Sequence, residues 1–504
     1  MKRAPLLSGV VALLVYLALA PPVLGAGDSA ELTLVLAFDG VAHPTGYPLW
    51  TLFGHLFVRM LHALGVAWPY AANAWSALGA AAAVALLHAA ARRLLPPRPE
   101  GPAWAWETTA LAPAALFLLL PTWTGVATVA EVYSWHQAWV HGAVVAFLAI
   151  AGIGAAPGAA ALAGWGLLVG AGLAHHLTSL LVAAPLTLAI GATVVGDGAR
   201  RGAPLAAARR AGAFVAGAIV PLLTYASIYL KSDRDGPGFW PALTPGWAGF
   251  RAHVTGAQYH GALRGFAWPD ADRTLLAGSI APILAVALFL LVAALLLARQ
   301  ARERMALGAL LAAALFQIAF SLTYRVADPA QYFLPALGIA LLSIPSFVGA
   351  VAVRAPRPGA VAVPAACLAA LLAVSLGVPG FRAAAEERRT LVGFDGLLRR
   401  MWGVIPYREG IVLWRNDMAP RLVCYREFDG TGVGLEVWNP WQFTDASVRA
   451  RFAARHGFDP VGDLTLARED LLATGPDSPS TRAFFSDVAH RINERVAVPV
   501  VLFE

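Results

Sequence analysis

Two carboxylates follow the first apolar run of the chain. Asp28 and Glu31 lie three residues apart in GDSAE, so they would share one face of a helix. A carboxylate there can act as a general base that takes a proton from an acceptor hydroxyl group. The alternative is structural, with Asp28 as a helix N-cap and Glu31 as the second half of a capping pair. The spacing alone leaves both interpretations open.

The residues that follow predict a turn and then a helix along the membrane surface. In AFDGVAHPTGYPLW, the closely spaced Pro44, Gly46 and Pro48 predict an irregular turn. Residues 49–66 place aromatic and leucine side chains at helical spacing, with Arg59 and His62 between them. This pattern is typical of an amphipathic helix at the membrane interface.

Three further polar residues lie beside predicted spans. Glu131 is the one acid of PTWTGVATVAEVYSWH, and it is either a substrate contact or a solvated loop residue. His175 and His176 are adjacent, so they cannot both face one site from a regular helix. We expect one of them to pack and the other to be available to a ligand. No His or acid follows three or four residues later, so the pair does not form a metal-binding pattern.

Two later segments have residues suited to a sugar or a phosphate. The stretch 231–273 contains aromatic and polar side chains that suit a carbohydrate or lipid-headgroup groove, although interfacial aromatics also line ordinary membrane proteins: Trp240, Trp247, Phe250, Tyr259 and His260. In TYRVADPAQYFLP, Arg325 either pairs with Asp328 or binds an anion such as phosphate.

The elements that must position these residues are membrane spans. A bilayer core about 30 Å thick needs about 20 apolar residues per helix. Hydropathy predicts eleven spans, rich in Gly, Ala and Pro as suits close helix packing in lipid: 4–25, 71–95, 107–121, 136–154, 157–173, 177–195, 211–230, 274–298, 305–323, 331–351 and 359–380.

Composition supports this class and excludes others. Of the 504 residues, 58% are hydrophobic and 13% charged, whereas a soluble domain has about 25% charged residues. One large soluble enzyme, a disordered chain and a nucleic-acid binder are therefore excluded, despite the net charge of +7. The two cysteines, Cys367 and Cys424, form no disulfide framework or metal cluster.

The distribution of charge predicts the orientation. With the N-terminus inside, the inner loops contain 14 basic and three acidic residues, and the outer loops seven basic and nine acidic ones. The loops 27–70 and 231–273 then lie outside. Residues 1–26 are expected to stay as an anchor, with a cleaved signal peptide as the alternative.

Residues 381–504 contain 33 of the 67 charged residues and predict a separate domain on the outer side. An amphipathic stretch precedes three β-type runs, GIVLWRND, RLVCYREF and VGLEVWN, and then a helical pattern and a closing strand. We expect an α/β domain that recognises the acceptor or covers the site. Asp417 ends an apolar run and is either a ligand contact or a turn residue.

Five elements, in order over residues 27–335, resemble one known family. They are Asp28-Ser-Ala-Glu31 with Ala42-His-Pro-Thr-Gly-Tyr-Pro-Leu49, then Ala130-Glu-Val-Tyr133, Gly172-Leu-Ala-His-His-Leu-Thr178, His253-Val-Thr-Gly256 with Gln258-Tyr259, and Tyr324 to Pro335. The chain is similar to the polytopic family, formerly a domain of unknown function, that is related to protein O-mannosyltransferases in the GT-C superfamily. Ala30 and Thr45 replace a usual Gly and Pro, and residues 381–504 match no family motif.

The resemblance implies an all-α GT-C membrane fold at the cell (inner) membrane. It implies transfer of a sugar, with mannose as one candidate, from a polyprenyl-phosphate carrier on the outer face. The acceptor would be a protein Ser or Thr hydroxyl or an envelope glycan. It also favours catalysis over capping for Asp28, with Glu31 second.

In this scheme Asp28 activates an acceptor oxygen, which attacks the anomeric carbon of the sugar in line. The configuration of that carbon is inverted, and the lipid phosphate leaves. Arg325 is the first choice to bind that phosphate, before Lys231, Arg234 and Arg251. His43 and Tyr47 would shape the turn beside Asp28, while the other expected substrate contacts are Glu131, Tyr133, His175, His176, Tyr259 and Asp328.

The scheme requires no cofactor and no metal ion, although a divalent metal is not excluded. Two other functions stay open. A transporter or flippase of a lipid-linked sugar predicts paired polar residues at mid-membrane and a repeat between halves, neither of which is evident. A non-catalytic scaffold would tolerate replacement of Asp28 and Glu31 together.

Overall fold

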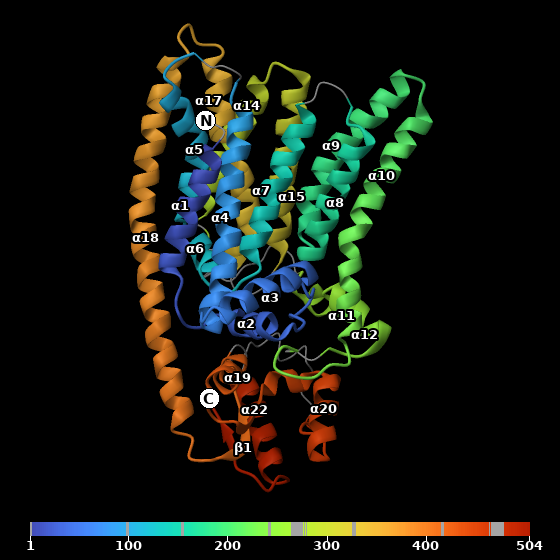
Figure 1. Cartoon of the computed structure of the whole chain (residues 1–504), viewed down its shortest axis with the longest axis vertical. Coiled ribbons are helices and arrows are strands. Elements are labelled where there is room, and N and C mark those ends of the chain that lie inside the picture. The colour runs from blue at the N-terminus through green and yellow to red at the C-terminus, as the bar shows by residue number, and fades with distance from the viewer. Residues whose placement is uncertain are drawn as a thin grey trace.

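The protein is mainly helical and arranged in three layers (Figure 1). The computed structural model describes residues 3–96, 100–152, 156–239, 243–263, 280–324, 329–414, 418–462 and 478–503, with single residues 276, 278 and 464. The largest layer is a bundle of long helices: α1 (Ala4–Leu19), α4 (Trp68–Leu94), α5 (Ala103–Leu118), α6 (Pro121–Ala127), α7 (Tyr133–Ala151), α8 (Ala159–His175), α9 (Ser179–Arg200), α10 (Pro204–Leu222), α14 (Ala281–Leu297), α15 (Ala301–Thr323), α16 (Leu334–Leu341), α17 (Ser343–Ala352) and the start of α18 (Gly359–Gly403).

Each predicted span contains a helix, but not every helix is a simple span. Among the described residues, six helices are long and apolar enough to cross a membrane, or seven if the bent pair α5 and α6 is one span. That pair bends by 73° where Pro121 begins α6. A multi-pass membrane protein is thus confirmed by length and composition, while the number eleven stays a prediction.

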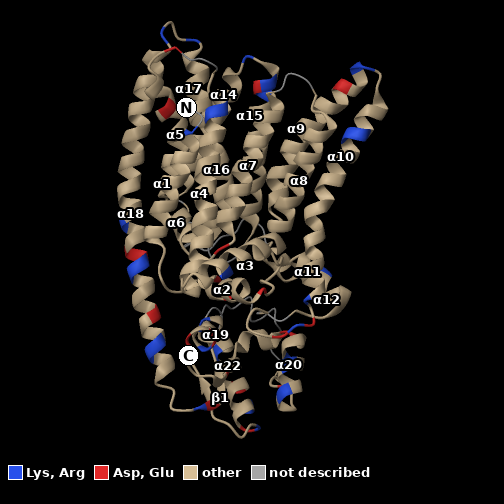
Figure 2. Cartoon of the chain, viewed as in Figure 1, with Lys and Arg blue, Asp and Glu red and all other residues tan. Residues whose placement is uncertain are grey.

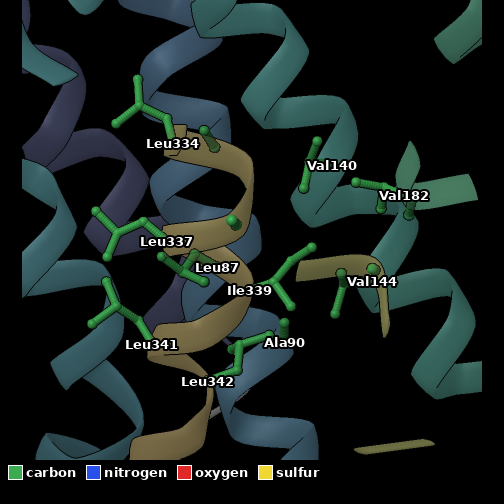
Figure 3. Close-up of a cluster of buried hydrophobic side chains, with 14 of the residues drawn as sticks. Leu87, Ala90, Val140, Val144, Val182, Leu334, Leu337, Ile339, Leu341 and Leu342 are labelled. Carbon is green, nitrogen blue, oxygen red and sulfur yellow. The ribbon is translucent and has the colours of Figure 1, made fainter. Parts of the chain in front are cut away.

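Apolar side chains of four helices meet in the centre of the bundle (Figure 3). Leu337 and Ile339 of α16 lie among side chains of α4, α7 and α9, including Leu87, Val144 and Val182. All five are almost fully buried. Burying an aliphatic side chain of this size contributes about 1.5–3 kcal/mol against water. This central packing fixes the ends of the helices on which the second layer rests.

The second layer lies across one end of the bundle (Figure 1). It consists of α2 (Ser29–Phe38), α3 (Pro48–Ala63), η1 (Leu223–Tyr225), α11 (Ala226–Leu230), α12 (Gly246–Val254), η2 (Ala257–Ala262) and η3 (Pro329–Phe333). Helix α2 is buried along almost its whole length. Helix α3 is the predicted amphipathic helix: Trp50 and Val58 are buried, while Phe53, Leu56 and Met60 are more than half exposed.

The C-terminal domain forms the third layer. A three-stranded parallel sheet in the order β2-β1-β3 is built from β1 (Glu409–Leu413), β2 (Gly434–Trp438) and β3 (Val500–Leu502). Val412 pairs with Val437 and with Val501. The remaining elements are α19 (Met418–Asp429), η4 (Pro440–Thr444), α20 (Ala446–His456) and α22 (Pro479–Asn493).

Helix α18 continues through residue 380 to Gly403, because a change from apolar to charged residues does not stop a helix, and the domain boundary expected at residue 380 stays a prediction. The run RLVCYREF is helical in α19, so its prediction as a β-type run is wrong. Seven consecutive residues of α19, from Ala419 to Tyr425, are buried between the sheet and the second layer. That burial on all sides overrides the β-propensity of Val, Cys and Tyr.

Charged residues mark the two ends of the molecule (Figure 2). Basic residues gather at the loops of the bundle end that lies away from α2 and α3. Charges of both signs occur in the lower half of α18 and in the C-terminal domain. The part of the bundle between these regions is almost free of charge (Figure 2).

Candidate active site

Asp28 stands at the start of α2 but does not cap it. It occupies the N-cap position, yet its side chain makes no capping hydrogen bond. The carboxylate is 57% exposed, and one oxygen lies 3.8 Å from Nε2 of His43. Glu31, which a capping pair would direct back to the N-cap, instead contacts His43. The arrangement therefore leaves the Asp28 carboxylate accessible and beside an imidazole ring.

Glu31 anchors the turn that follows α2. It is buried, and its Oε1 accepts hydrogen bonds from the backbone N–H of His43 at 2.7 Å and from Nδ1 of the same residue at 3.0 Å. Burial raises the pKa of Glu31, an effect that the attraction of His43 partly offsets. The turn is held from its other side by His253, whose Nε2 lies 3.0 Å from the carbonyl of Ala42.

Both ring nitrogens of His43 face acceptors. Nδ1 faces the Glu31 carboxylate, and Nε2 lies 3.1 Å from the Tyr47 hydroxyl, which donates to the carbonyl of Pro44. A neutral imidazole has one donor, whereas an imidazolium has two. Burial alone lowers the pKa of His43, but the nearby Glu31 and Asp28 carboxylates outweigh it and raise the pKa to about 10. The two carboxylates and the two acceptors at its ring nitrogens therefore favour the imidazolium form of His43.

Aromatic side chains at the ends of α3, α7 and α8 and in η3 form a wall beside the acids. The ring of Tyr47 stacks on His176 with a centroid distance of 5.6 Å. Tyr133, at the start of α7, lies 5.8 Å from the same ring, and its hydroxyl donates to the Tyr332 hydroxyl at 2.7 Å. His176 itself contacts the Thr178 hydroxyl at 2.6 Å. Flat faces and hydroxyl groups of this kind suit a sugar ring.

The two adjacent histidines have different surroundings. His175 is packed, with its Nε2 3.1 Å from the carbonyl of Val132, whereas His176 lies against the two tyrosines. Glu131 is placed near the acids: a methyl group built on Gly27 would lie 4.0 Å from its Oε1. Burial raises the pKa of Tyr259, and the charge of Asp28 adds to that increase.

The expected phosphate-binding cations are only partly described. Arg325 and Asp328 lie outside the described residues, as does Asp417. Lys231 is engaged elsewhere, because its Nζ donates to the side chain and the carbonyl of Asp39 at 2.6 and 2.9 Å. Arg234 and Arg251 are exposed in the second layer. Among the described cations, His43 is the one in contact with Asp28.

The same three residues offer ligand atoms for a metal ion. One atom each from Asp28, Glu31 and His43 lies within 4.8 Å of the others. Carboxylate and imidazole groups are common zinc ligands. In this arrangement Glu31 accepts hydrogen bonds from His43, and the Asp28 carboxylate lies 3.8 Å from the same ring.

Sequence reasoning did not single out several residues of this site. Tyr332, from η3, bonds Tyr133, and His136 of α7 lies 4.9 Å from His176 between ring centroids. Arg421 of α19 reaches the segment before Asp28. Tyr332 stands in a segment already singled out, so only its role was missed. His136 and Arg421 gave no signal, because distant parts of the chain bring them to the site.

Comparisons with known proteins agree with this fold. Residues 28–193 match the family model described as the protein O-mannosyl-transferase TMEM260 N-terminal domain. The chain is also similar to the crystal structure of ArnT from Cupriavidus metallidurans bound to undecaprenyl phosphate. The TM-score is 0.52 at 15% identity, covering 83% of this chain and 84% of that one. A comparison with curated proteins finds no significant match.

The family model covers the acid pair, the turn with His43 and Tyr47, and the adjacent His175 and His176. The shared fold extends over most of the chain. The chain therefore has a fold similar to that of ArnT, and its residues 28–193 resemble the N-terminal domain of a protein O-mannosyl-transferase.

Proposed function

We propose that this protein is a membrane glycosyltransferase that moves a sugar from a polyprenyl-phosphate carrier to an acceptor hydroxyl group on the outer face of the membrane. The observation that carries this proposal is the accessible Asp28 carboxylate beside the His43 ring and the aromatic wall. The family model is named for protein O-mannosyl-transfer, and the similar ArnT structure holds a polyprenyl phosphate, which supports this class of donor.

The proposed reaction is a single displacement with inversion. Asp28 takes the proton from the acceptor hydroxyl, and the freed oxygen forms a bond to the anomeric carbon. The bond from that carbon to the phosphate oxygen breaks, and the phosphate leaves on its lipid. Asp28 suits the base because Glu31 is buried and already accepts two hydrogen bonds.

His43 has an electrostatic role in this mechanism. Its ring nitrogen lies 3.8 Å from the Asp28 carboxylate, so a positive charge on the ring attracts that carboxylate and helps to hold it in place. Departure of the phosphate also needs positive charge or hydrogen-bond donors. We propose Arg325 for that role, with the Tyr133 and Tyr332 hydroxyls on the sugar side of the site. Mannose is the first sugar to test, and a protein Ser or Thr the first acceptor.

The direct test replaces Asp28 by Asn. Loss of a general base costs about 10²–10⁴-fold in rate, so we expect D28N to lose transfer while folding normally. The matched control is Asp233→Asn, which changes an exposed acid of the second layer. Transfer is measured with purified enzyme and labelled polyprenyl-phosphate mannose. Mass spectrometry of envelope glycans from cells with and without the chain identifies the sugar and the acceptor. Full activity of D28N would remove Asp28 as the base.

A second test concerns the metal ion. The ion-paired cluster of Asp28, Glu31 and His43 leads us to expect that transfer persists after dialysis against EDTA. Activity is compared before chelation, after it, and after addition of Mn²⁺ or Zn²⁺. Loss on chelation with recovery by one of these ions would instead assign the three residues as metal ligands.

A further inference from the structure

The segment that carries the acid pair is part of the C-terminal domain's hydrophobic core. Leu24, Ala30 and Leu34 belong to one buried cluster with Trp402 of α18 and residues of β1 and α19, such as Leu422. The thiol of Cys424 points at the carbonyl of Ala30 with 3.5 Å between sulfur and oxygen. The chain before and within α2 therefore depends on contacts from nearly 400 residues later.

Arg421 makes the most direct of these contacts. Arg421 is 1% exposed, and its guanidinium group donates to the carbonyl of Leu24 at 3.3 Å and to the carbonyl of Gly25. Gly25 in turn donates its N–H to the Ser29 hydroxyl at 3.0 Å, which closes the turn around Asp28. A side chain at Gly25 would collide with Val129 at 2.5 Å, so the segment has little room to shift.

A buried carboxylate holds the guanidinium in place. Asp395 of α18 lies 3.6 Å from Nη1 of Arg421 and is only 2% exposed. Its oxygens also accept from the Tyr425 hydroxyl at 2.8 Å and from Arg399 at 2.7 Å. Charge-assisted hydrogen bonds in a buried network hold their geometry more firmly than exposed pairs.

We propose that Arg421 is a positioning residue through which the C-terminal domain sets the place of Asp28. The inference rests on the proposed function, because it assumes that the position of Asp28 determines the rate. Arg421 donates to the backbone carbonyls of Leu24 and Gly25, and Gly25 lies three residues before Asp28. Among the described residues, its hydrogen bonds go to this backbone and not to the side chains of the site. Arg421 should therefore influence the rate of the chemical step, kcat, and not the binding of the lipid donor.

The experiment compares Arg421→Lys and Arg421→Met with wild type in the full-length protein. A misplacement of about 1 Å costs about 100-fold in rate. We expect kcat to fall by about that factor in R421M, with the KM for the lipid donor within about twofold of wild type. R421K keeps the charge and should recover part of the loss. The matched control is Arg388→Lys, because Arg388 also donates to a backbone carbonyl, that of Ala20 at 3.2 Å, but eight residues before Asp28. R388K should keep the wild-type kcat.

Two further measurements keep the outcome decisive. The double variant Arg421→Met with Asp395→Asn removes one positive and one negative buried charge together, and Arg399 keeps its ion pair with Asp429, so the variant should fold yet remain slow. Hydrogen exchange of residues 26–34 should rise in R421M and stay unchanged in R388K. Wild-type kcat in the folded double variant, or unchanged exchange in R421M, would overturn the proposal. Faster exchange in R421M together with full activity of D28N would retain the positioning role but reject Asp28 as the base.

Discussion

At the residue scale, the charge of His43 depends on Glu31. Burial lowers the pKa of His43, and the charge of Glu31 is the largest of the effects that raise it. Together the raising effects outweigh burial and bring the pKa of His43 to about 10. In Glu31→Gln the effect of that charge is lost, so the pKa of His43 falls and its proton leaves at lower pH. The activity of E31Q relative to wild type should therefore drop as pH rises, reaching about a 100-fold deficit at pH 8.5. The check is kcat/KM for both proteins between pH 5.5 and 8.5.

The control for this prediction is His43→Gln, which has no titrating ring. Its activity relative to wild type should be lower but independent of pH over the same range. A deficit of E31Q that is equally large at pH 5.5 would show that Glu31 acts by holding the backbone of His43 instead. The same linkage predicts stability: protonation of His43 stabilises the fold fully below its ordinary pKa, and this contribution is lost as pH rises through about 10.

How far the sequence predicts a site residue depends on its distance along the chain. Asp28, Glu31, His43 and Tyr47 lie within one loop, so their types and spacing indicated a common site. The hydroxyl pair Tyr133–Tyr332 joins residues 199 positions apart, and the Arg421 contact with Gly25 joins residues 396 apart. Packing alone brings these together. Capping was excluded only by geometry, because the residue types at the start of α2 fit both interpretations.

At the element scale, helices α8 and α10 meet through glycine. A Cβ on Gly170 would lie 2.1 Å from the carbonyl oxygen of Ala218, so Gly170→Ala must push the helices apart. Such overpacking costs about 1–3 kcal/mol of the free energy of unfolding. Gly164 of the same helix has nothing within 4 Å of its Cβ position. Gly164→Ala should be neutral or stabilising by up to about 1 kcal/mol.

Both variants are compared by thermal unfolding in detergent micelles, with transfer activity as a second readout. Equal stability of G170A and G164A would mean that α8 and α10 separate at no cost, contrary to the close approach of their backbones. The density of Gly and Ala in the predicted spans had indicated close helix packing. Which glycine faces which helix follows only from the fold.

Element boundaries were predicted less well than element types. Hydropathy located a helix within every predicted span, because lipid requires closed backbone hydrogen bonding. It did not locate the bend between α5 and α6, nor the continuation of α18 beyond residue 380. Hydropathy reports which residues suit lipid, whereas a helix ends where its backbone geometry changes. A change from apolar to charged residues within one helix can therefore be mistaken for the start of a new domain.

At the scale of the whole molecule, the site lies between two layers of different origin. The bundle end and α2 supply the acids and the aromatic wall, and the C-terminal domain covers α2 from the other side (Figure 1). Asp235 of the loop after α11 also pairs with Arg451 and Arg455 of α20. Removing the C-terminal domain would expose Leu24, Ala30 and Leu34, so truncation would test folding before it tested acceptor recognition.

The charge pattern predicts which side of the membrane this site faces. Basic residues gather at the bundle end away from α2 and α3 (Figure 2), and such residues are retained on the cytoplasmic side. Arg357, between α17 and α18, should then be cytoplasmic, and Glu494, after α22, should be outside. Both residues belong to the surface: Arg357 is exposed, and Glu494 pairs there with His490.

This prediction is tested with single cysteines at these two positions in a background in which the exposed Cys367 is replaced by Ala. A membrane-impermeant maleimide should label Glu494→Cys in intact cells, and Arg357→Cys only after the membrane is opened. In the background protein Cys424, which is buried, is the remaining cysteine, so any labelling of that protein measures the reaction of Cys424. The reverse pattern would place Asp28 in the cytoplasm, where a carrier loaded on the outer face could not reach it. The transferase proposal would then require a donor presented from the inside, so orientation decides between two reactions that the same site geometry allows.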